Sequence, residues 1–155
     1  MVSLRPITDA NREAVVSLRV SPAQERYVSS VEESLQEAAD DAGGRAIFWA
    51  IYDDETPVGF VMISDEVDGP GYIPHYLWRL IIDERHQRQG HGTAALDLIA
   101  DYFRGRPGVE VLSTSAGEGT GSPIPFYERC GFVRTGEMVF DDEVLLQLRL
   151  RMRRP

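Results

Sequence analysis

The chain has 155 residues, 43% of them hydrophobic and 26% charged, which is enough for one hydrophobic core, so we expect a single domain over residues 1–155. Its formal net charge of -9 argues against nucleic-acid binding, because phosphate recognition needs a basic surface. The chain contains no long apolar run that could cross a bilayer and no apolar secretory signal near its start, so we expect a cytoplasmic protein that does not bind membranes.

The N-terminal third is predicted to hold one strand and two helices. Residues 2–7 alternate as a short strand, and Thr8 or Asp9 is suited to cap a helix that buries Val15. A second helix is expected after Pro22, because apolar residues recur there at helical spacing. These residues are Tyr27, Val28, Val31, Leu35 and Ala38.

Three antiparallel strands are predicted next. Residues 45–52 and 58–64 are rich in aromatic and branched side chains and flank a turn at 53–57, which predicts a β-hairpin. A turn with glycine and proline at 65–71 then leads into a third strand at 72–82.

A helix and a parallel crossover are predicted in the second half. Residues 91–104 repeat apolar side chains every three or four positions, as in an amphipathic helix that packs on a sheet. A buried strand at 109–115 follows this helix, so it should pair in parallel with the strand at 72–82 or splay away from it. A short helix is expected at 123–130.

The last two predicted strands, at 132–139 and 144–152, form a second hairpin. The alternating leucines and arginines of the second strand would either pair with a second subunit, giving a possible homodimer, or close the sheet. The elements together predict an α+β (α/β) fold, with a mixed, largely antiparallel sheet of about seven strands flanked by about four helices.

The segment 82–93 carries the first functional signal. A strand ends there, and a loop with Gly90 and Gly92 opens directly into the predicted helix. Exposed N–H groups, the positive end of a helix dipole and glycines that admit a ligand suit a diphosphate. The loop also concentrates basic side chains in an acidic chain, namely Arg85, His86, Arg88 and His91. A tight turn without a ligand would use the same glycines, so both interpretations stay open for this segment alone.

A second segment gives this loop a context. The loop matches neither the P-loop pattern nor the G-x-G-x-x-G pattern of dinucleotide-binding folds. In segment 122–132, Tyr127 lies on a short predicted helix, four residues before Gly131 and Phe132. The two segments together, and the order of elements along nearly the whole chain, resemble the GCN5-related N-acetyltransferases.

The resemblance implies acetyl-CoA as the cofactor and acetyl transfer to an amine. It implies that the loop 87–93 binds the diphosphate, that the end of the preceding strand pairs with the pantetheine arm, and that Tyr127 lies near the sulfur. The cofactor-binding residues that it implies are Leu80, Ile82, Gln87, Arg88, Gln89, Gly90, His91, Gly92, Thr93, Ser122 and Tyr127.

Further segments resemble bacterial polyamine (spermine/spermidine) acetyltransferases. They are residues 76–87, 112–115 and 119–132, with additional similarity at 24–28 and 33–35. The similarity implies spermidine or spermine as the acceptor. The implied substrate-binding residues are Glu33, His75, Tyr76, Trp78 and Glu118.

Acetyl transfer requires an unprotonated amine, a group that stabilises an oxyanion, and a proton donor for the departing thiolate. Tyr127 suits the catalytic role of donor, because the reference pKa of a phenol, about 10, lies above that of a thiol, about 8.5. A packing role would explain the same tyrosine, and a backbone N–H near Leu80 would meet the oxyanion. Water would serve as the base, or one of four side chains, which are His75, Tyr76, Glu33 and Glu118.

Other functions remain open from the sequence. The acceptor would alternatively be an aminoglycoside, an amino acid or a protein amine. A CoA-binding domain without turnover is also considered, because Ser122 stands where many relatives carry Asn and no base is evident. We expect no metal, because Cys130 and the three histidines match no zinc pattern.

Overall fold

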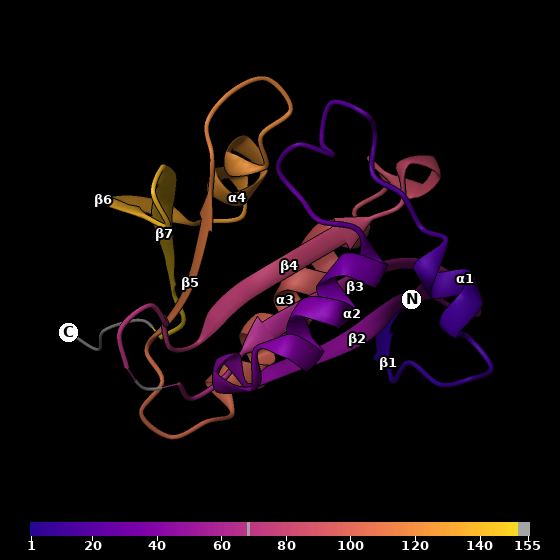
Figure 1. Ribbon diagram of the computed structural model, residues 1–155, viewed down its shortest axis with the longest axis horizontal. Coiled ribbons are helices and arrows are strands. Elements are labelled where there is room, and N and C mark those ends of the chain that lie inside the picture. The colour runs from indigo at the N-terminus through magenta and orange to yellow at the C-terminus, as the bar shows by residue number, and fades with distance from the viewer. Residues whose placement is uncertain (68, 152–155) are drawn as a thin grey trace.

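The computed structural model describes residues 1–67 and 69–151. Within them, seven strands form one mixed sheet in the order β1-β2-β3-β4-β5-β7-β6, and four α-helices flank it (Figure 1), which confirms the expected fold class. The strands are β1 (Val2–Arg5), β2 (Ala46–Asp53), β3 (Thr56–Ser64), β4 (Tyr76–Ile82), β5 (Val111–Ala116), β6 (Val133–Val139) and β7 (Glu143–Arg149). The helices are α1 (Arg12–Val16), α2 (Val31–Asp40), α3 (His91–Arg104) and α4 (Ile124–Arg129).

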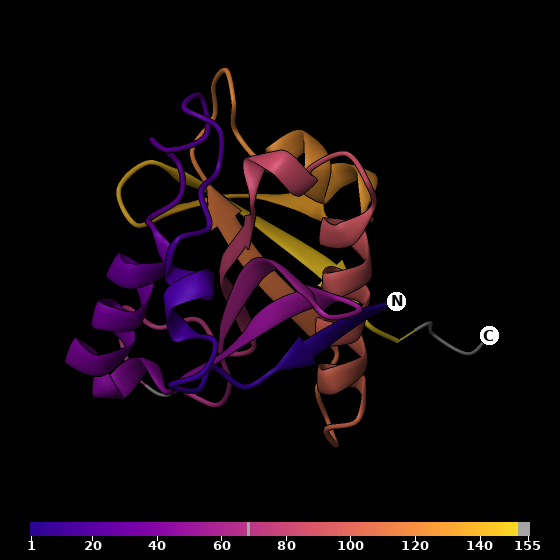
Figure 2. The same ribbon diagram turned by 90° about the vertical axis from the view of Figure 1, so that its right-hand side faces the viewer.

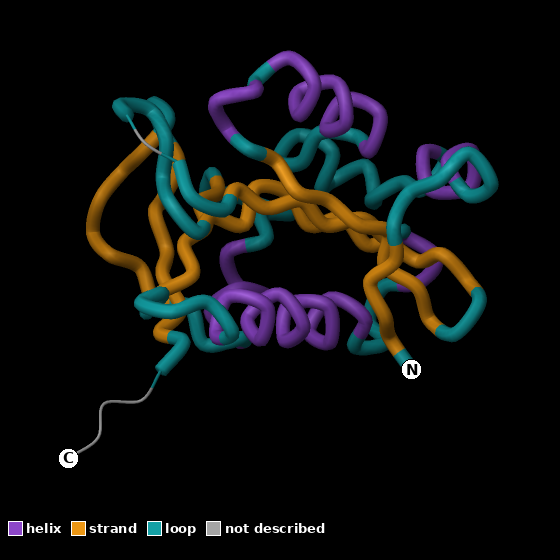
Figure 3. The backbone as a smooth tube through the Cα atoms, turned by 90° about the horizontal axis from the view of Figure 1, so that it is seen from below, coloured by secondary structure: helices purple, strands orange, loops and turns teal. Residues whose placement is uncertain are grey.

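The sheet has a hydrophobic core on each face, because its inner strands bury both sides. On β3, Phe60 and Met62 pack with α1 and α2, while Val61 and Ile63 pack with α3 and α4. This alternation follows from the period of two in a strand. Figure 2 shows α2 on one side of the sheet and α3 on the other, and Figure 3 shows helices on both sides of the strand layer. None of the helices in the described ranges is long and apolar enough to cross a bilayer.

The β4–β5 pair is the place in the middle of the sheet where two neighbouring strands are barely paired. β3 and β4 are paired along their length, and β5 is paired with β7 over six positions, but β4 and β5 meet in parallel at Tyr76 and Ser113 alone. The pairing of β3 with β4 also skips Trp78, since Met62 faces Arg79 and Ile63 faces Leu77. The two strands therefore diverge beyond Tyr76, as the sequence predicted for a parallel or splayed pair.

Several predicted boundaries near the N-terminus are wrong. Helix α1 has Asn11 as its N-cap, not Thr8 or Asp9, because residues 9–11 form a separate turn before the helix begins at Arg12. Tyr27 and Val28 do not belong to α2.

Helix α2 begins later than predicted because Ser30 forms a capping box. Its hydroxyl accepts the amide of Glu33 (3.1 Å), and the Glu33 carboxylate accepts the amide of Ser30 (3.0 Å). Two otherwise unpaired amides are satisfied in this way, which fixes the helix start. Residues 22–27 form turns instead of a helix.

The strands that border the opening also differ from their predicted ranges. β4 begins at Tyr76 and not at residue 72, because His75 has a left-handed backbone (φ 52°) that an extended strand does not allow. β5 begins at Val111. β7 lies between β5 and β6 and so completes the sheet of its own chain, which is one of the two arrangements expected from the sequence. It ends at Arg149, and the predicted end of this strand at residue 152 lies outside the described residues.

Candidate active site

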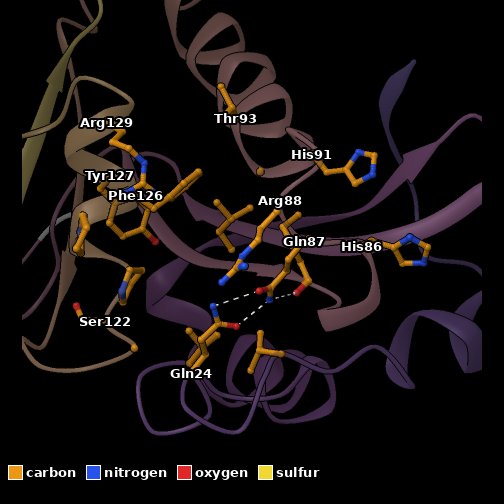
Figure 4. A pocket seen from close by; sticks show the side chains of 18 of the residues that line it. Gln24, His86, Gln87, Arg88, His91, Thr93, Ser122, Phe126, Tyr127 and Arg129 are labelled. Carbon is orange, nitrogen blue, oxygen red and sulfur yellow. Dashed lines mark hydrogen bonds between the residues drawn. The ribbon is translucent and has the colours of Figure 1, made fainter.

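A cavity of about 550 Å³ opens where β4 and β5 diverge. Its walls are the end of β4, the following loop with the start of α3, helix α4, and the segment at residues 20–28 (Figure 4). Ten of the residues predicted to bind the cofactor line it, and Gln89 does not. The ten are Leu80, Ile82, Gln87, Arg88, Gly90, His91, Gly92, Thr93, Ser122 and Tyr127.

The loop between β4 and α3 leaves a row of backbone amides without protein partners. Gly90 is the N-cap of α3 in a left-handed conformation (φ 84°), and Arg88 is also left-handed (φ 63°). The first helical hydrogen bond runs from the Ala94 amide to the Gly90 carbonyl (3.0 Å). Within the described chain, none of the amides from Gln87 to Thr93 donates to a protein acceptor. Free amides at a helix start, with the helix dipole behind them, form an anion-binding site.

The two glycines of the loop have different reasons to be glycine. At Gly90 an added Cβ would meet nothing within 4 Å, so the left-handed backbone alone favours glycine. At Gly92 an added Cβ would lie 3.1 Å from the ring of Phe126, so the lack of a side chain lets α3 and α4 approach each other. Both glycines therefore keep side-chain bulk out of the cavity mouth.

Gln87 is used inside the protein to join three segments. Its side-chain amide donates to the Ile82 carbonyl (2.9 Å) and to Oε1 of Gln24 (2.8 Å), and Gln24 donates back to Oε1 of Gln87 (3.3 Å). Figure 4 shows this pair beneath Arg88. Its side chain therefore orders the loop, while its backbone amide stays available.

Asp83 anchors the start of the same loop. This carboxylate is almost fully buried and accepts the amides of Arg19 (2.9 Å) and Arg85 (3.1 Å) and the Arg85 guanidinium (2.8 Å). Burial by itself would raise the pKa of Asp83, but these hydrogen bonds outweigh it and hold the pKa below its usual value. Asp83 thus ties the segment after α1 to the end of β4.

The cationic side chains of the loop face different ways. Arg88 and Arg129 line the cavity, whereas Arg85 is paired with Asp83. His86 and His91 border the cavity, but Figure 4 shows their rings turned away from Arg88. Arg88 and Arg129 are therefore the charges best placed to meet an anion beside the free amides.

Tyr127 lies at the inner end of the cavity, on α4. Its ring packs against Phe126 and Phe132, with centroids 5.7 Å and 5.5 Å away. Burial raises the pKa of Tyr127 well above its usual value, and the Thr114 hydroxyl opposes this in part. At neutral pH Tyr127 thus keeps its proton and can act as a donor.

Ser122 holds the loop that leads into α4. Its hydroxyl donates to the Gly117 carbonyl (2.6 Å) and accepts the amide of Ile124 (3.2 Å). It also lines the cavity. Its hydroxyl is therefore engaged in shaping the wall.

A second cavity of about 400 Å³ is lined by three carboxylates and one arginine. It is bounded by Arg26 and Tyr27 before α2, by Gly117 and Glu118 after β5, and by Asp142 and Glu143 at the turn before β7. The segment before α2 and the loop between β5 and α4 line both cavities, so the two are neighbours. A cation would be favoured here.

Tyr76 connects the opening in the sheet to the second cavity. Its hydroxyl forms a hydrogen bond with Ser115, and Ser115 donates to Oε1 of Glu143 (2.9 Å). Burial raises the pKa of Tyr76 to about 12. Of the predicted substrate-binding residues, Glu118 lines the second cavity, whereas Tyr76 lines neither cavity and is connected to the second one through Ser115 and Glu143.

The other three predicted substrate-binding residues line neither cavity. His75 precedes β4 and packs against Phe103, with ring centroids 5.6 Å apart. Trp78 packs on Gly44. Glu33 serves the capping box, where the hydrogen bond from the Ser30 amide holds its pKa below the usual value.

Several residues that line the cavities were not predicted from the sequence. Gln24 belongs to a segment predicted only as similar to polyamine acetyltransferases, and Arg129 lies two residues after the predicted Tyr127. Asp142 and Glu143 form an acidic turn between two predicted strands, which was the one available signal for the second cavity.

Known proteins share this architecture. A family model described as "Acetyltransferase (GNAT) family" matches residues 2–132. The spermine/spermidine N(1)-acetyltransferase of Bacillus subtilis (strain 168) is 28% identical over 150 residues, which cover 94% of this chain and 96% of the relative.

Solved structures show the same fold at lower identity. The aminoglycoside acetyltransferase AAC(6')-Ib, in complex with coenzyme A, has a TM-score of 0.74 at 16% identity, covering 96% of this chain and 95% of the other. A spermidine/spermine N-acetyltransferase from Vibrio cholerae has a TM-score of 0.63 at 17% identity, covering 96% and 92%.

The divided sheet with its open loop before α3 thus has the fold of solved acetyltransferases. The chain belongs to the acetyltransferase (GNAT) family, and it is an N-acetyltransferase.

Replacement of the buried carboxylate tests how the loop is held. Asp83→Asn should lower the free energy of unfolding at neutral pH by about 1–3 kcal/mol, because three donors lose a charged acceptor. The pKa of Asp83 is depressed in the folded state, so this stabilisation is present above the unfolded pKa of about 3.9 and is lost as pH falls through the folded value.

Urea unfolding at a series of pH values measures this effect. The stabilities of the wild type and Asp83→Asn should converge as the pH falls through the folded-state pKa of Asp83. The exposed neighbour provides the control, since Glu84→Gln should follow the wild type throughout. A stability difference that stays constant down to the acid end would show that the charge of Asp83 contributes nothing.

Proposed function

We propose that this acetyltransferase moves the acetyl group of acetyl-CoA to a primary amine of a polyamine such as spermidine or spermine. The observation that carries the proposal is the pair of neighbouring cavities at the divided sheet, one with free amides and arginines and the other with three carboxylates. The first suits the phosphates of acetyl-CoA, and the second suits an acceptor that bears several positive charges.

Acetyl-CoA is the donor, and the first cavity is where we place it. The amides from Gln87 to Thr93 would hold the diphosphate, with Arg88 and Arg129 beside it. On the side that faces β5, β4 has no partner strand beyond Tyr76, so this edge near Leu80 is free to pair with the amides of the pantetheine arm. This arrangement brings the thioester toward Tyr127. Solved acetyltransferases of this fold include complexes with coenzyme A.

The acceptor would enter through the second cavity. This cavity is lined by three carboxylates and one arginine, which are Glu118, Asp142, Glu143 and Arg26. Arg134 pairs with Glu118 and weakens its attraction for a cation. Polyamine nitrogens are protonated at neutral pH, since the pKa of an alkylammonium is about 10.4. The Bacillus subtilis relative is named for spermine and spermidine, which supports the same acceptor here.

The reaction needs one bond made and one broken. The neutral amine attacks the thioester carbonyl and forms the C–N bond, and a backbone N–H of β4 near Leu80 would stabilise the oxyanion. The C–S bond then breaks, and Tyr127 gives its proton to the departing thiolate, because burial keeps the phenol protonated. The nitrogen loses one proton to water as the amide forms, and Tyr127 regains one from water, so the reaction leaves a neutral amide, the free thiol of CoA and a protonated Tyr127.

Removal of the Tyr127 hydroxyl tests the proton donor. Tyr127→Phe should lower kcat by roughly 10² to 10⁴, because the thiolate must leave unprotonated. Binding of acetyl-CoA should stay close to that of the wild type, since the ring and its packing against Phe132 remain. Tyr72→Phe is the matched control, because it removes a phenol hydroxyl that contacts Asp41 and lies at neither cavity. An unchanged kcat for Tyr127→Phe would limit this tyrosine to packing.

A panel of acceptors tests the substrate class. Free CoA release, followed with a thiol reagent, should saturate with spermidine and spermine and should increase with pH as the amines lose protons. An aminoglycoside, free amino acids and a peptide with a free N-terminus complete the panel. Flat turnover with both polyamines would reject the proposed acceptor. Tight binding of acetyl-CoA without transfer to any amine would reject the proposed reaction as a whole.

A further inference from the structure

A chain of three side chains leads from the opening between β4 and β5 to the second cavity. The Tyr76 hydroxyl is hydrogen-bonded to Ser115, and Ser115 donates to Glu143. Tyr76 is buried, Ser115 is half-buried, and Glu143 lines the cavity that opens to solvent. These residues come from β4, β5 and the start of β7, so the tertiary fold alone brings them together.

The direction of the hydrogen bonds is fixed along this chain. The Glu143 carboxylate is an acceptor, so the Ser115 proton points toward it (2.9 Å). Ser115 has one proton, and therefore it accepts from the Tyr76 hydroxyl. The remaining lone pair of the Tyr76 oxygen is left to accept from a group in the opening. Every proton in the chain is thus directed away from the opening and toward Glu143.

Tyr76 also lies at the end of the opening from which β4 and β5 diverge. Its Cα is level with Ser113, yet its hydroxyl reaches Ser115, so the ring extends along β5 toward the side where the strands diverge. Phe140 packs edge-on against the ring with centroids 6.1 Å apart and holds it in place. Since burial raises the pKa of Tyr76 to about 12, the phenol stays protonated at neutral pH and can pass a proton on without being ionised beforehand.

We propose that Tyr76, Ser115 and Glu143 form the proton exit of this acetyltransferase, with Glu143 as the final acceptor. The inference rests on the proposed function, because it requires an amine acceptor that enters through the second cavity and places its reacting nitrogen in the opening beside Tyr76. It assigns the base that the sequence left open to a carboxylate reached through two hydroxyls, and it gives Ser115 a role in catalysis.

The proton transfer balances over the three groups. The ammonium of the acceptor gives one proton to the Tyr76 oxygen, while Tyr76 gives its own to Ser115 and Ser115 gives its own to Glu143. The nitrogen lone pair that is set free forms the C–N bond with the acetyl group. The carboxylic acid of Glu143 then releases its proton to water in the cavity.

The charged groups around Glu143 are compatible with release of a proton from this residue to solvent. Glu118 and Asp142 line the same cavity, and Arg26 faces them from the segment before α2. Tyr27 donates to the Glu118 carbonyl (3.4 Å), and Arg134 pairs with the Glu118 side chain. Arg134 thus binds Glu118, and no cation in the described part of the chain forms an ion pair with Glu143. The Glu143 carboxylate is therefore open to the solvent of the cavity.

Interruption of the chain at its middle tests the proposal. Ser115→Ala removes the relay hydroxyl and adds no charge, so kcat with spermidine at neutral pH should fall roughly 10²-fold while KM changes less than about twofold. The lost rate should return as pH rises and free amine accumulates. Ser115→Thr keeps a hydroxyl and should restore the wild-type pH profile. Glu143→Gln should lower kcat in the same way, and Glu137→Gln on exposed β6 is the control.

An acceptor that is unprotonated at neutral pH separates proton removal from other defects. Trifluoroethylamine needs no base, so Ser115→Ala and the wild type should acetylate it at equal rates. An equal loss with this amine and with spermidine would overturn the relay, as would a wild-type kcat and pH profile for Ser115→Ala. A rise in KM alone for Glu143→Gln would also overturn it and would leave Glu143 as a binding group for the cation.

The same measurements distinguish the two proposals. If the wild type transfers acetyl groups to an amine and the variants match it, the relay is wrong and the function stands. If the wild type binds acetyl-CoA and transfers to none of the amines, the function is wrong and the relay is wrong with it.

Discussion

β4 and β5 run in parallel, but within the described residues they are paired at Tyr76 and Ser113 alone. On its other side each strand is paired with a neighbour, β4 with β3 and β5 with β7. The opening between β4 and β5 therefore leaves these two pairings intact. The cavity with the free amides is lined by the end of β4 at this opening, and the cavity with the carboxylates lies beside it, between the loop after β5 and the start of β7. A buried sheet normally pairs its inner edges, and the unpaired edge here leaves room for a ligand in place of a strand, as we propose for the pantetheine arm.

The loop after β4 is held rigid so that its amides can remain free. Asp83 secures its start, Gln87 joins it to Ile82 and Gln24, and the left-handed Gly90 turns the chain into α3. These contacts order a row of backbone amides that have no acceptor within the described part of the protein. Preorganised donors of this kind bind an anion without a further cost of ordering.

Local patterns predicted the parts of the fold that depend on neighbours in sequence. The apolar spacing of α3 gave both of its ends, and the glycines before it indicated the loop. The start of α2 was misplaced because the capping box of Ser30 and Glu33 outweighs the apolar spacing of Tyr27 and Val28. Of the second cavity, the sequence predicted Glu118 alone. The hydrogen-bonded chain of Tyr76, Ser115 and Glu143 could not be predicted, since strand order brings these residues together and no short motif joins them.

The central claim is that the amides at the start of α3 bind the diphosphate of coenzyme A, and calorimetric titration of coenzyme A into two glycine variants tests it most directly. Gly90 and Gly108 both have a left-handed backbone (φ 84° and 79°) and open space where a Cβ would go, so alanine strains each to a similar degree. We expect Gly90→Ala to weaken coenzyme A binding by about tenfold or more, which corresponds to about 1.4 kcal/mol, and Gly108→Ala to bind like the wild type. Equal affinity of Gly90→Ala and the wild type would contradict the claim.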